Sequence, residues 1–294
     1  MGAGYLDRLD AKLTAGVARL SDAFATRRAS YISSQQMPDG GFCGRAGGSD
    51  LYYADFALRT LALLGAPADV AARAASYLGT LAASPKTVVE SFCWLNCARM
   101  LRRLGVPVHI DVESLLGPLQ VPPAGAYDAF LGALSYEVIG REMPGRTAVV
   151  AAVAKLEQPG GGFGEQRGAP VAQTNATAAA VAFLRMSDAL EAGAAGRAAQ
   201  FLYTMQTAAG GFLAHAAAPE PDLLSTFTAL VTLIDLDAAD NADLSATARF
   251  VRDLAHPGGG FRSSPSDAET DVEYAYYGVA AVALLKEHAS RGHG

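Results

Sequence analysis

Two charged residues, Asp55 and Arg59, have the side-chain types and the spacing for chemistry on one helix. They are four residues apart, so they lie on the same helical face and can form an ion pair. Tyr52 and Phe56 share that face. An ion pair keeps the carboxylate ionised, which suits a buried structural pair or a polar anchor for a ligand but is the wrong state for a proton donor. A structural pair is the favoured interpretation, and an anchor or an acid inside a cavity is the alternative.

Two further sets of side chains could form a site. Cys93 and Cys97 are one helical turn apart and could share a metal ion, although small buried cysteines more often simply pack a helix. Aromatic residues concentrate on the runs predicted below to face inward, where they either pack the core or line a cavity for an apolar ligand. They are Phe92, Trp94, Tyr127, Phe130, Tyr136, Tyr274, Tyr276 and Tyr277.

The elements that would position these residues repeat along the chain. The tripeptide Gly-Gly-Phe ends at Phe163, Phe212 and Phe261, at a constant interval of 49 residues. Each copy opens a polar loop that leads into an apolar run. A fixed interval of this size indicates an array of similar supersecondary units, none of which can bury its apolar face alone.

The apolar runs have helical periodicity without sustained two-residue alternation, so the predicted fold class is all-α. Runs that are apolar on nearly every face alternate with amphipathic runs, which predicts buried inner helices and exposed outer helices. One short outer helix is expected over 111–119. The inner helices are expected at 49–64, 87–104, 126–139, 173–186, 222–236 and 271–285. Six such pairs would close an α6/α6 toroid, a single domain over residues 1–294, with the inner N-termini at one mouth.

The composition limits the classes of partner. Hydrophobic residues make up 51% of the chain and charged residues 18%, which supports a large core and excludes disorder. The net charge of −6 argues against nucleic acid. No stretch has the ~20 apolar residues of a membrane span, and no signal peptide is evident. Three cysteines do not make a disulfide framework. We therefore expect a cytoplasmic protein.

The loop motifs resemble a known repeat. Gln36–Phe42, Gln158–Phe163 and Pro257–Phe261 are similar to the repeat shared by protein prenyltransferase β subunits and squalene/terpenoid cyclases. Gly278–Leu285 is most similar to the last inner helix of the type II protein geranylgeranyltransferase β subunit, and Pro221–Leu224 matches the start of its fifth inner helix. The resemblance implies the α6/α6 toroid that the repeat also predicts.

The resemblance further implies where a zinc site would lie. These transferases hold zinc with an Asp, a Cys two residues later and a His in the sixth inner helix; the matching residues here are Asp222, Leu224 and Tyr274. One carboxylate does not hold zinc, which takes about four N, S or O ligands. We therefore expect that the zinc ligands are not retained and that no cofactor is used.

The basic residues with which the family binds a diphosphate are also largely replaced in this sequence. The loop that carries its basic residues has only His215 here, and the His that opens the fourth inner helix corresponds to Gln173. Without charge-assisted contacts an allylic diphosphate would be held poorly.

Three functions follow from the residues and the resemblance together. The first is a prenyltransferase-like toroid that binds an isoprenoid or other apolar ligand in an aromatic cavity, with zinc-dependent transfer lost. The second is an active metal-independent terpenoid cyclase or divergent prenyltransferase, and the third is a scaffold that binds a protein on the toroid face. The candidate acid or base residues are Asp55, Asp222 and Tyr274. The candidate ligand-binding residues are Tyr52, Phe56, Arg59, Trp94, Tyr127, Gln173, His215, Phe227 and Tyr277.

Overall fold

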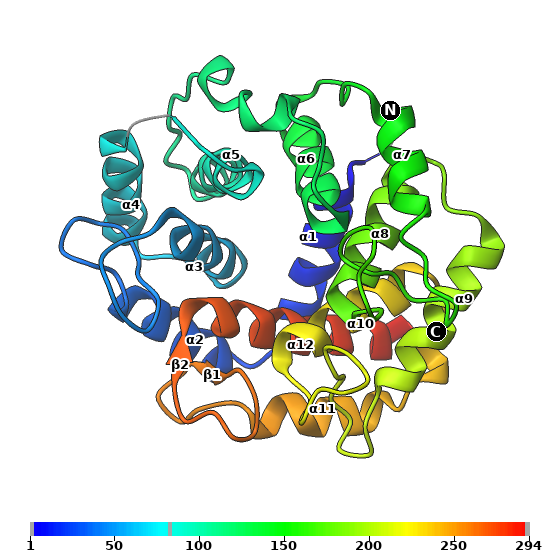
Figure 1. Ribbon diagram of the computed structural model, residues 1–294. Coiled ribbons are helices and arrows are strands. Elements are labelled where there is room, and N and C mark those ends of the chain that lie inside the picture. Colours follow the sequence, from blue (N-terminus) through cyan, green and yellow to red (C-terminus); the bar gives the residue numbers. More distant parts are fainter. Residues whose placement is uncertain (1–2, 82–83, 292–294) are drawn as a thin grey trace.

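Six helices form a closed inner ring in the computed structural model, which describes residues 3–81 and 84–291 (Figure 1). Each contacts the next along the chain, and the last contacts the first. The predicted all-α toroid is therefore confirmed. The ring consists of α3 (Leu51–Leu64), α5 (Val88–Arg103), α6 (Ala126–Ile139), α8 (Thr174–Met186), α10 (Leu223–Asp235) and α12 (Val272–Arg291). Only α12 clearly exceeds its expected bounds, continuing past residue 285 to Arg291.

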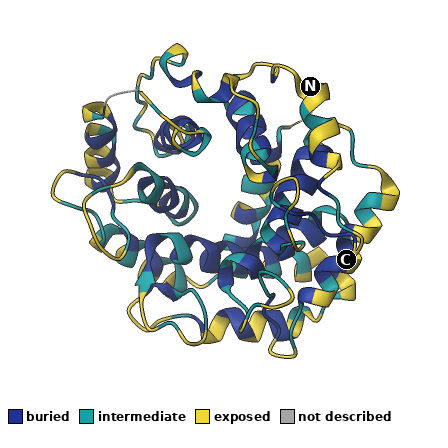
Figure 2. Cartoon of the chain, viewed as in Figure 1, coloured by how far each residue is buried: buried dark blue, intermediate teal, exposed yellow. Residues whose placement is uncertain are grey.

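An outer layer of helices covers this ring, and the residues exposed to solvent concentrate on this layer and on the loops (Figure 2). It contains α2 (Asp22–Ser34), α4 (Ala68–Thr80), α7 (Arg146–Ala154), α9 (Ala192–Met205) and α11 (Leu244–Asp253). The expected outer helix over 111–119 is wrong: two short 3₁₀ turns, η1 (Glu113–Leu115) and η2 (Pro118–Gln120), replace it. Pro118 has no N–H to donate to the preceding turn, so the hydrogen-bond pattern of an α-helix is interrupted there. A further 3₁₀ turn, η3 (Ala239–Asn241), precedes α11. Within the described residues, no helix is long and apolar enough to cross a membrane.

The Gly-Gly-Phe loops join the two layers. Phe163, Phe212 and Phe261 are each at most 1% exposed, so the repeated aromatic ring is a core anchor. Gly210 has a φ of +94°, a conformation that side chains rarely adopt. A Cβ on Gly211 would lie 2.6 Å from the ring of Phe250 on α11. The two glycines therefore permit the tight turn and its close approach to the outer helix.

A repeated hydrogen bond places the start of one inner helix against the loop of the next unit. The N–H of the first residue of α6, α8 and α10 donates to the carbonyl two residues beyond the phenylalanine of the next Gly-Gly-Phe loop. The pairs are Ala126 to Glu165 (2.8 Å), Thr174 to Ala214 (2.9 Å) and Leu223 to Ser263 (2.8 Å). Neighbouring inner helices therefore begin at the same mouth of the ring.

Helix α1 (Tyr5–Val17) crosses the opposite mouth, where the inner helices end. Glu137, near the end of α6, accepts hydrogen bonds from the N–H groups of Tyr5 at 2.7 Å and Leu6 at 2.8 Å, and so caps α1 from outside. Lys12 pairs at 2.5 Å with Asp235, the last residue of α10. These contacts fix α1 as a cover over one end of the ring.

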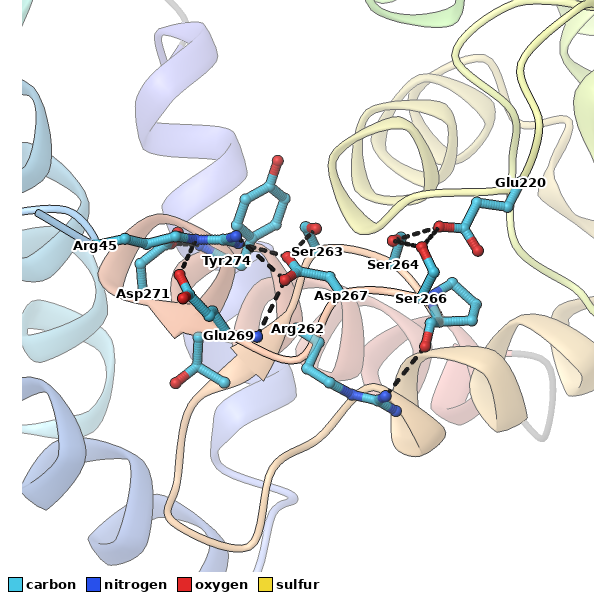
Figure 3. Close-up of polar contacts among 12 residues, drawn as sticks. Arg45, Glu220, Arg262, Ser263, Ser264, Ser266, Asp267, Glu269, Asp271 and Tyr274 are labelled. Atoms are coloured by element: carbon cyan, nitrogen blue, oxygen red, sulfur yellow. Dashed lines mark hydrogen bonds and ion pairs between the residues drawn. The ribbon is translucent and has the colours of Figure 1, made fainter.

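The seam between the last and the first unit is held by side chains (Figure 3). Arg45 lies in the loop that follows Gly40-Gly41-Phe42, and its guanidinium donates to Asp267 at 2.6 Å and to Asp271 at 3.0 Å. Asp271 belongs to the small hairpin of β1 (Phe261–Arg262) and β2 (Thr270–Asp271), which pair antiparallel just before α12. The guanidinium thus joins segments more than 200 residues apart in the sequence.

Candidate ligand-binding cavity

A cavity of about 370 Å³ lies between the six inner helices and α1. Corresponding positions on successive helices line it in layers because the helices start at one mouth and share a register. The mouth layer is the second residue of five of these helices: Tyr52, Val89, Tyr127, Asn175 and Leu224. Glu273, the second residue of α12, does not line the cavity but bonds the hydroxyl of the lining Tyr52.

The middle layer, one turn deeper, is mainly aromatic. It is formed by Phe56, Phe92, Phe130, Phe227, Tyr276 and Tyr277. Phe227 and Tyr277 lie 5.3 Å apart between ring centroids, and Phe56 lies 5.2 Å from Tyr277. On α8 the same level holds the small residues Ala178 and Ala179. The aromatic rings are therefore opposed by a wall of methyl groups, which leaves room inside the ring.

Asp55 and Arg59 form the charged part of the cavity wall. Their ion pair spans 2.7 Å, and Asn96 on α5 donates a hydrogen bond of 2.6 Å to the second oxygen of Asp55. Burial raises the pKa of Asp55, while the nearby guanidinium of Arg59 acts against that rise. Burial acts to lower the pKa of Arg59, but the Asp55 carboxylate together with Tyr276, Cys93 and Tyr277 outweighs burial, so that the pKa is raised. The expected ion pair is present, and its carboxylate is also held by an amide.

Aromatic rings surround the Arg59 guanidinium. Its central carbon lies 5.2 Å from the Phe56 ring, 5.3 Å from Phe92 and 5.4 Å from Tyr276, within cation–π range. Residues of α1, namely Tyr5, Leu6 and Leu9, complete the lining of the cavity.

A carboxylate lies directly behind the mouth layer, and none of the described residues of that layer is positively charged. Glu273 accepts hydrogen bonds from the hydroxyls of Tyr52 at 2.7 Å and Tyr277 at 3.3 Å. Burial raises the pKa of Glu273, whereas the hydrogen bond from Tyr52 lowers it in part. On the far side, Thr228 donates to Oδ1 of Asn175 at 2.7 Å.

The structure brings seven of the sequence-predicted site residues together in this cavity. They are Tyr52, Asp55, Phe56, Arg59, Tyr127, Phe227 and Tyr277. Trp94 does not line it; its ring is buried beside the loop between α4 and α5, because it lies one position round the helix from the lining Cys93. Gln173 and His215 also lie outside, in segments that precede α8 and α10. The lining from α1 was not predicted, because no sequence pattern states which mouth that helix covers.

Asp222 and Tyr274, the candidates carried over from the family, also lie outside the cavity lining. Asp222 caps α10: its carboxylate accepts from the N–H of Ser225 at 2.7 Å and from its hydroxyl at 2.8 Å. Tyr274 lies beside Arg45, whose guanidinium carbon is 5.8 Å from the centroid of the tyrosine ring (Figure 3). Burial and the Glu273 carboxylate raise the pKa of Tyr274 to about 12, so its hydroxyl stays protonated near neutral pH.

The zinc site that the family implies does not fit these residues. Leu224 has no donor atom, and the carboxylate of Asp222 is occupied by its own helix cap. In the part of the chain that the structure describes, no three His, Cys, Asp or Glu side chains converge as a set of metal ligands. Cys93 and Cys97 are free and buried, and burial raises the pKa of both thiols.

Comparisons with known proteins agree with this architecture. The family model for the prenyltransferase alpha-alpha toroid domain matches residues 8–94 and 129–293. A search of curated proteins gave no match.

Several solved structures share the fold at low identity. Protein geranylgeranyltransferase-I of Candida albicans, complexed with GGPP, superposes with a TM-score of 0.70 at 11% identity, over 88% of this chain and 90% of the other. A variant of the type II terpene cyclase MstE from Scytonema, in complex with geranylgeranyl dihydroxybenzoate, gives 0.57 at 11% identity over 95% and 99%. A wild-type glycosidase gives 0.58 at 12% identity over 98% and 99%. Because proteins with such different names share the fold, the fold alone does not determine the ligand.

Proposed function

The chain belongs to the prenyltransferase alpha-alpha toroid domain family, and from this premise we propose that its central cavity binds an isoprenoid or a similar apolar molecule. The aromatic middle layer is the observation that carries the proposal. Small-molecule sites are typically concave, about 300–1,000 Å³ in volume, and apolar with a few polar groups. A cavity of about 370 Å³ with aromatic walls and one ion pair fits that description. Among the family's branches, Gly278–Leu285 favours the type II β subunits.

We further propose that zinc-dependent prenyl transfer has been lost. The support is the chemistry of the donor set, since Leu224 and Tyr274 replace the thiolate and the imidazole of the family site. The carboxylate of Glu273 adds to this, because it lies behind the lining Tyr52 and Tyr277 and would repel the diphosphate of a prenyl donor. The three free cysteines fit the reducing, cytoplasmic compartment that we propose for the protein.

Cyclisation of a terpenoid is a second candidate function, favoured by one observation. Asp55 is the one of the three acid or base candidates that lines the cavity, and burial raises its pKa. Its ion pair with Arg59 argues against it, because the partner favours the ionised carboxylate. Turnover of a terpenoid substrate that disappears in Asp55→Asn would support this candidate.

Ligand occupancy can be tested directly with a variant that fills the cavity. Organic extraction of the purified protein, followed by mass spectrometry, should release an apolar small molecule. Ala178→Phe places a ring in the wall of methyl groups and should abolish that signal. Ala152→Phe makes the same change at an exposed position of α7 and should leave it intact.

Two results would overturn the proposal. One is a protein that carries no lipid and binds none of a panel of isoprenoids, which would favour the scaffold on the toroid face. The other is equal binding by wild type and Ala178→Phe.

A further inference from the structure

The deep end of the cavity differs chemically from its mouth. Arg59 is the ninth residue of α3, and the mouth-lining Tyr52 is the second. At a rise of 1.5 Å per residue, seven residues place the Cα of Arg59 about 10 Å deeper than that of Tyr52. Helix α1 covers this end, so a ligand that enters by the mouth brings its leading end to Arg59 and Asp55.

The polar groups at this end are only partly satisfied. Nε of Arg59 and Oδ1 of Asn96 are buried and have no hydrogen-bond partner among the described residues. Such atoms are uncommon in folded proteins, and each one costs free energy. The side chain of Arg59 remains 20% accessible and lines the cavity, so a ligand atom can reach it.

The mouth has less to offer a polar group. Glu273 already accepts from two tyrosine hydroxyls, and Oδ1 of Asn175 accepts from Thr228. The charge there is negative, whereas the ion pair at the deep end is neutral as a whole and presents both a donor and an acceptor. A ligand with an ionised head group would add an uncompensated charge at either end.

We propose that the cavity takes an isoprenoid-type molecule with one uncharged hydroxyl or carbonyl group, and that this group enters first and hydrogen-bonds the Asp55–Arg59 pair. A hydroxyl accepts from the guanidinium and can donate to the carboxylate, and the hydrocarbon chain fills the aromatic layer up to the mouth. The inference rests on the proposed function, because it specifies the ligand class of the same cavity.

The test compares three probes on the same branched isoprenoid chain. They are hexahydrofarnesol, which ends in a hydroxyl, farnesane, which lacks it, and hexahydrofarnesyl diphosphate. Dissociation constants are measured with the wild-type full chain. A hydrogen bond to a charged group predicts that the alcohol binds about tenfold more tightly than the hydrocarbon, and that the diphosphate binds most weakly.

Variants assign the preference to the ion pair. In Asp55→Leu/Arg59→Met the alcohol and the hydrocarbon should bind equally, while farnesane keeps its wild-type affinity. Glu157→Leu/Arg197→Met removes a similar pair, 2.6 Å apart on the outer surface, and should keep the tenfold preference.

Different results would contradict the ligand class inferred here and the proposed binding of an apolar ligand. Farnesane binding that Ala178→Phe abolishes, without any preference for the alcohol, would overturn the inference and leave the proposed function standing. The inference would also be overturned if the diphosphate bound more tightly than the alcohol and the hydrocarbon. If none of the three probes binds, both the inference and the proposed function are wrong. The wild-type series decides these points even if the double variant does not fold.

Discussion

The Asp55–Arg59 pair shows what a single helix reveals about a site. Their separation of four residues was enough to predict the contact, which the structure gives at 2.7 Å. The rest of the environment comes from other helices: Asn96 from α5 and Tyr276 from α12. Nothing in the local sequence around Asp55 could have predicted these neighbours, because their proximity depends on how the ring closes.

Removing one charge of the Asp55–Arg59 pair should destabilise the protein more than removing both. Asp55→Leu leaves the buried guanidinium of Arg59 uncompensated, and breaking such a pair costs about 3–5 kcal/mol of stability. Asp55→Leu/Arg59→Met removes both charges, so it should cost clearly less than the single change. Urea unfolding monitored by circular dichroism measures both. A double variant that is less stable than Asp55→Leu would contradict this account of the pair.

Helix α1 is the element that turns an open ring into a cavity with a closed end. Gly16 lets it approach α12 closely: a Cβ there would lie 2.0 Å from the carbonyl oxygen of Ala283. The sequence predicted helix in this region from the spacing of its leucines. It could not place the helix, because the position depends on contacts with Glu137, Asp235 and Ala283, all distant in the chain.

A pair of glycine substitutions tests how α1 docks. Gly16→Ala must push α1 away from α12, and overpacking of this kind costs about 1–3 kcal/mol. Gly196→Ala is the matched control on α9, where a Cβ meets no atom within 4 Å. That change should instead stabilise the protein by about 0.5–1 kcal/mol, because alanine is the better helix former. Thermal unfolding gives the sign of each effect. A neutral Gly16→Ala would mean that α1 is not packed tightly against α12.

Across the whole molecule, the inner helices were predictable because each is apolar on nearly every face and begins after a recognisable loop. The element missed was the outer helix over 111–119, where Gly117-Pro118 should have outweighed the apolar spacing. Of the site, the sequence predicted the aromatic residues of α3, α6, α10 and α12. Trp94, Asp222 and Tyr274 lie outside the cavity lining. Trp94 is one position round α5 from the lining Cys93, and Asp222 precedes α10 as its cap.

Closure of the ring depends on the seam, where Arg45, before α3, contacts Asp267 and Asp271, before α12 (Figure 3). Burial alone would raise the pKa of Asp267, but hydrogen bonds from Arg45 and Ser263 outweigh it and hold the pKa at about 2. An unperturbed aspartate titrates near 3.9. A group with a lowered folded-state pKa stabilises the fold above its unfolded pKa, and this contribution disappears as the pH falls through the folded value.

Asp267→Asn therefore tests whether this carboxylate secures the seam. The difference in unfolding free energy between wild type and Asp267→Asn should be constant above about pH 5 and shrink as the pH falls toward 2, because the carboxyl group becomes protonated over that range, first in the unfolded chain and then in the folded protein. Subtracting the variant removes the effect of the other carboxylates, which titrate in both proteins. Urea titrations at several pH values supply the measurement. A difference that stays the same down to pH 2 would show that Asp267 does not stabilise the ring through its charge, and would leave the Asp271 contact as the remaining tie to Arg45.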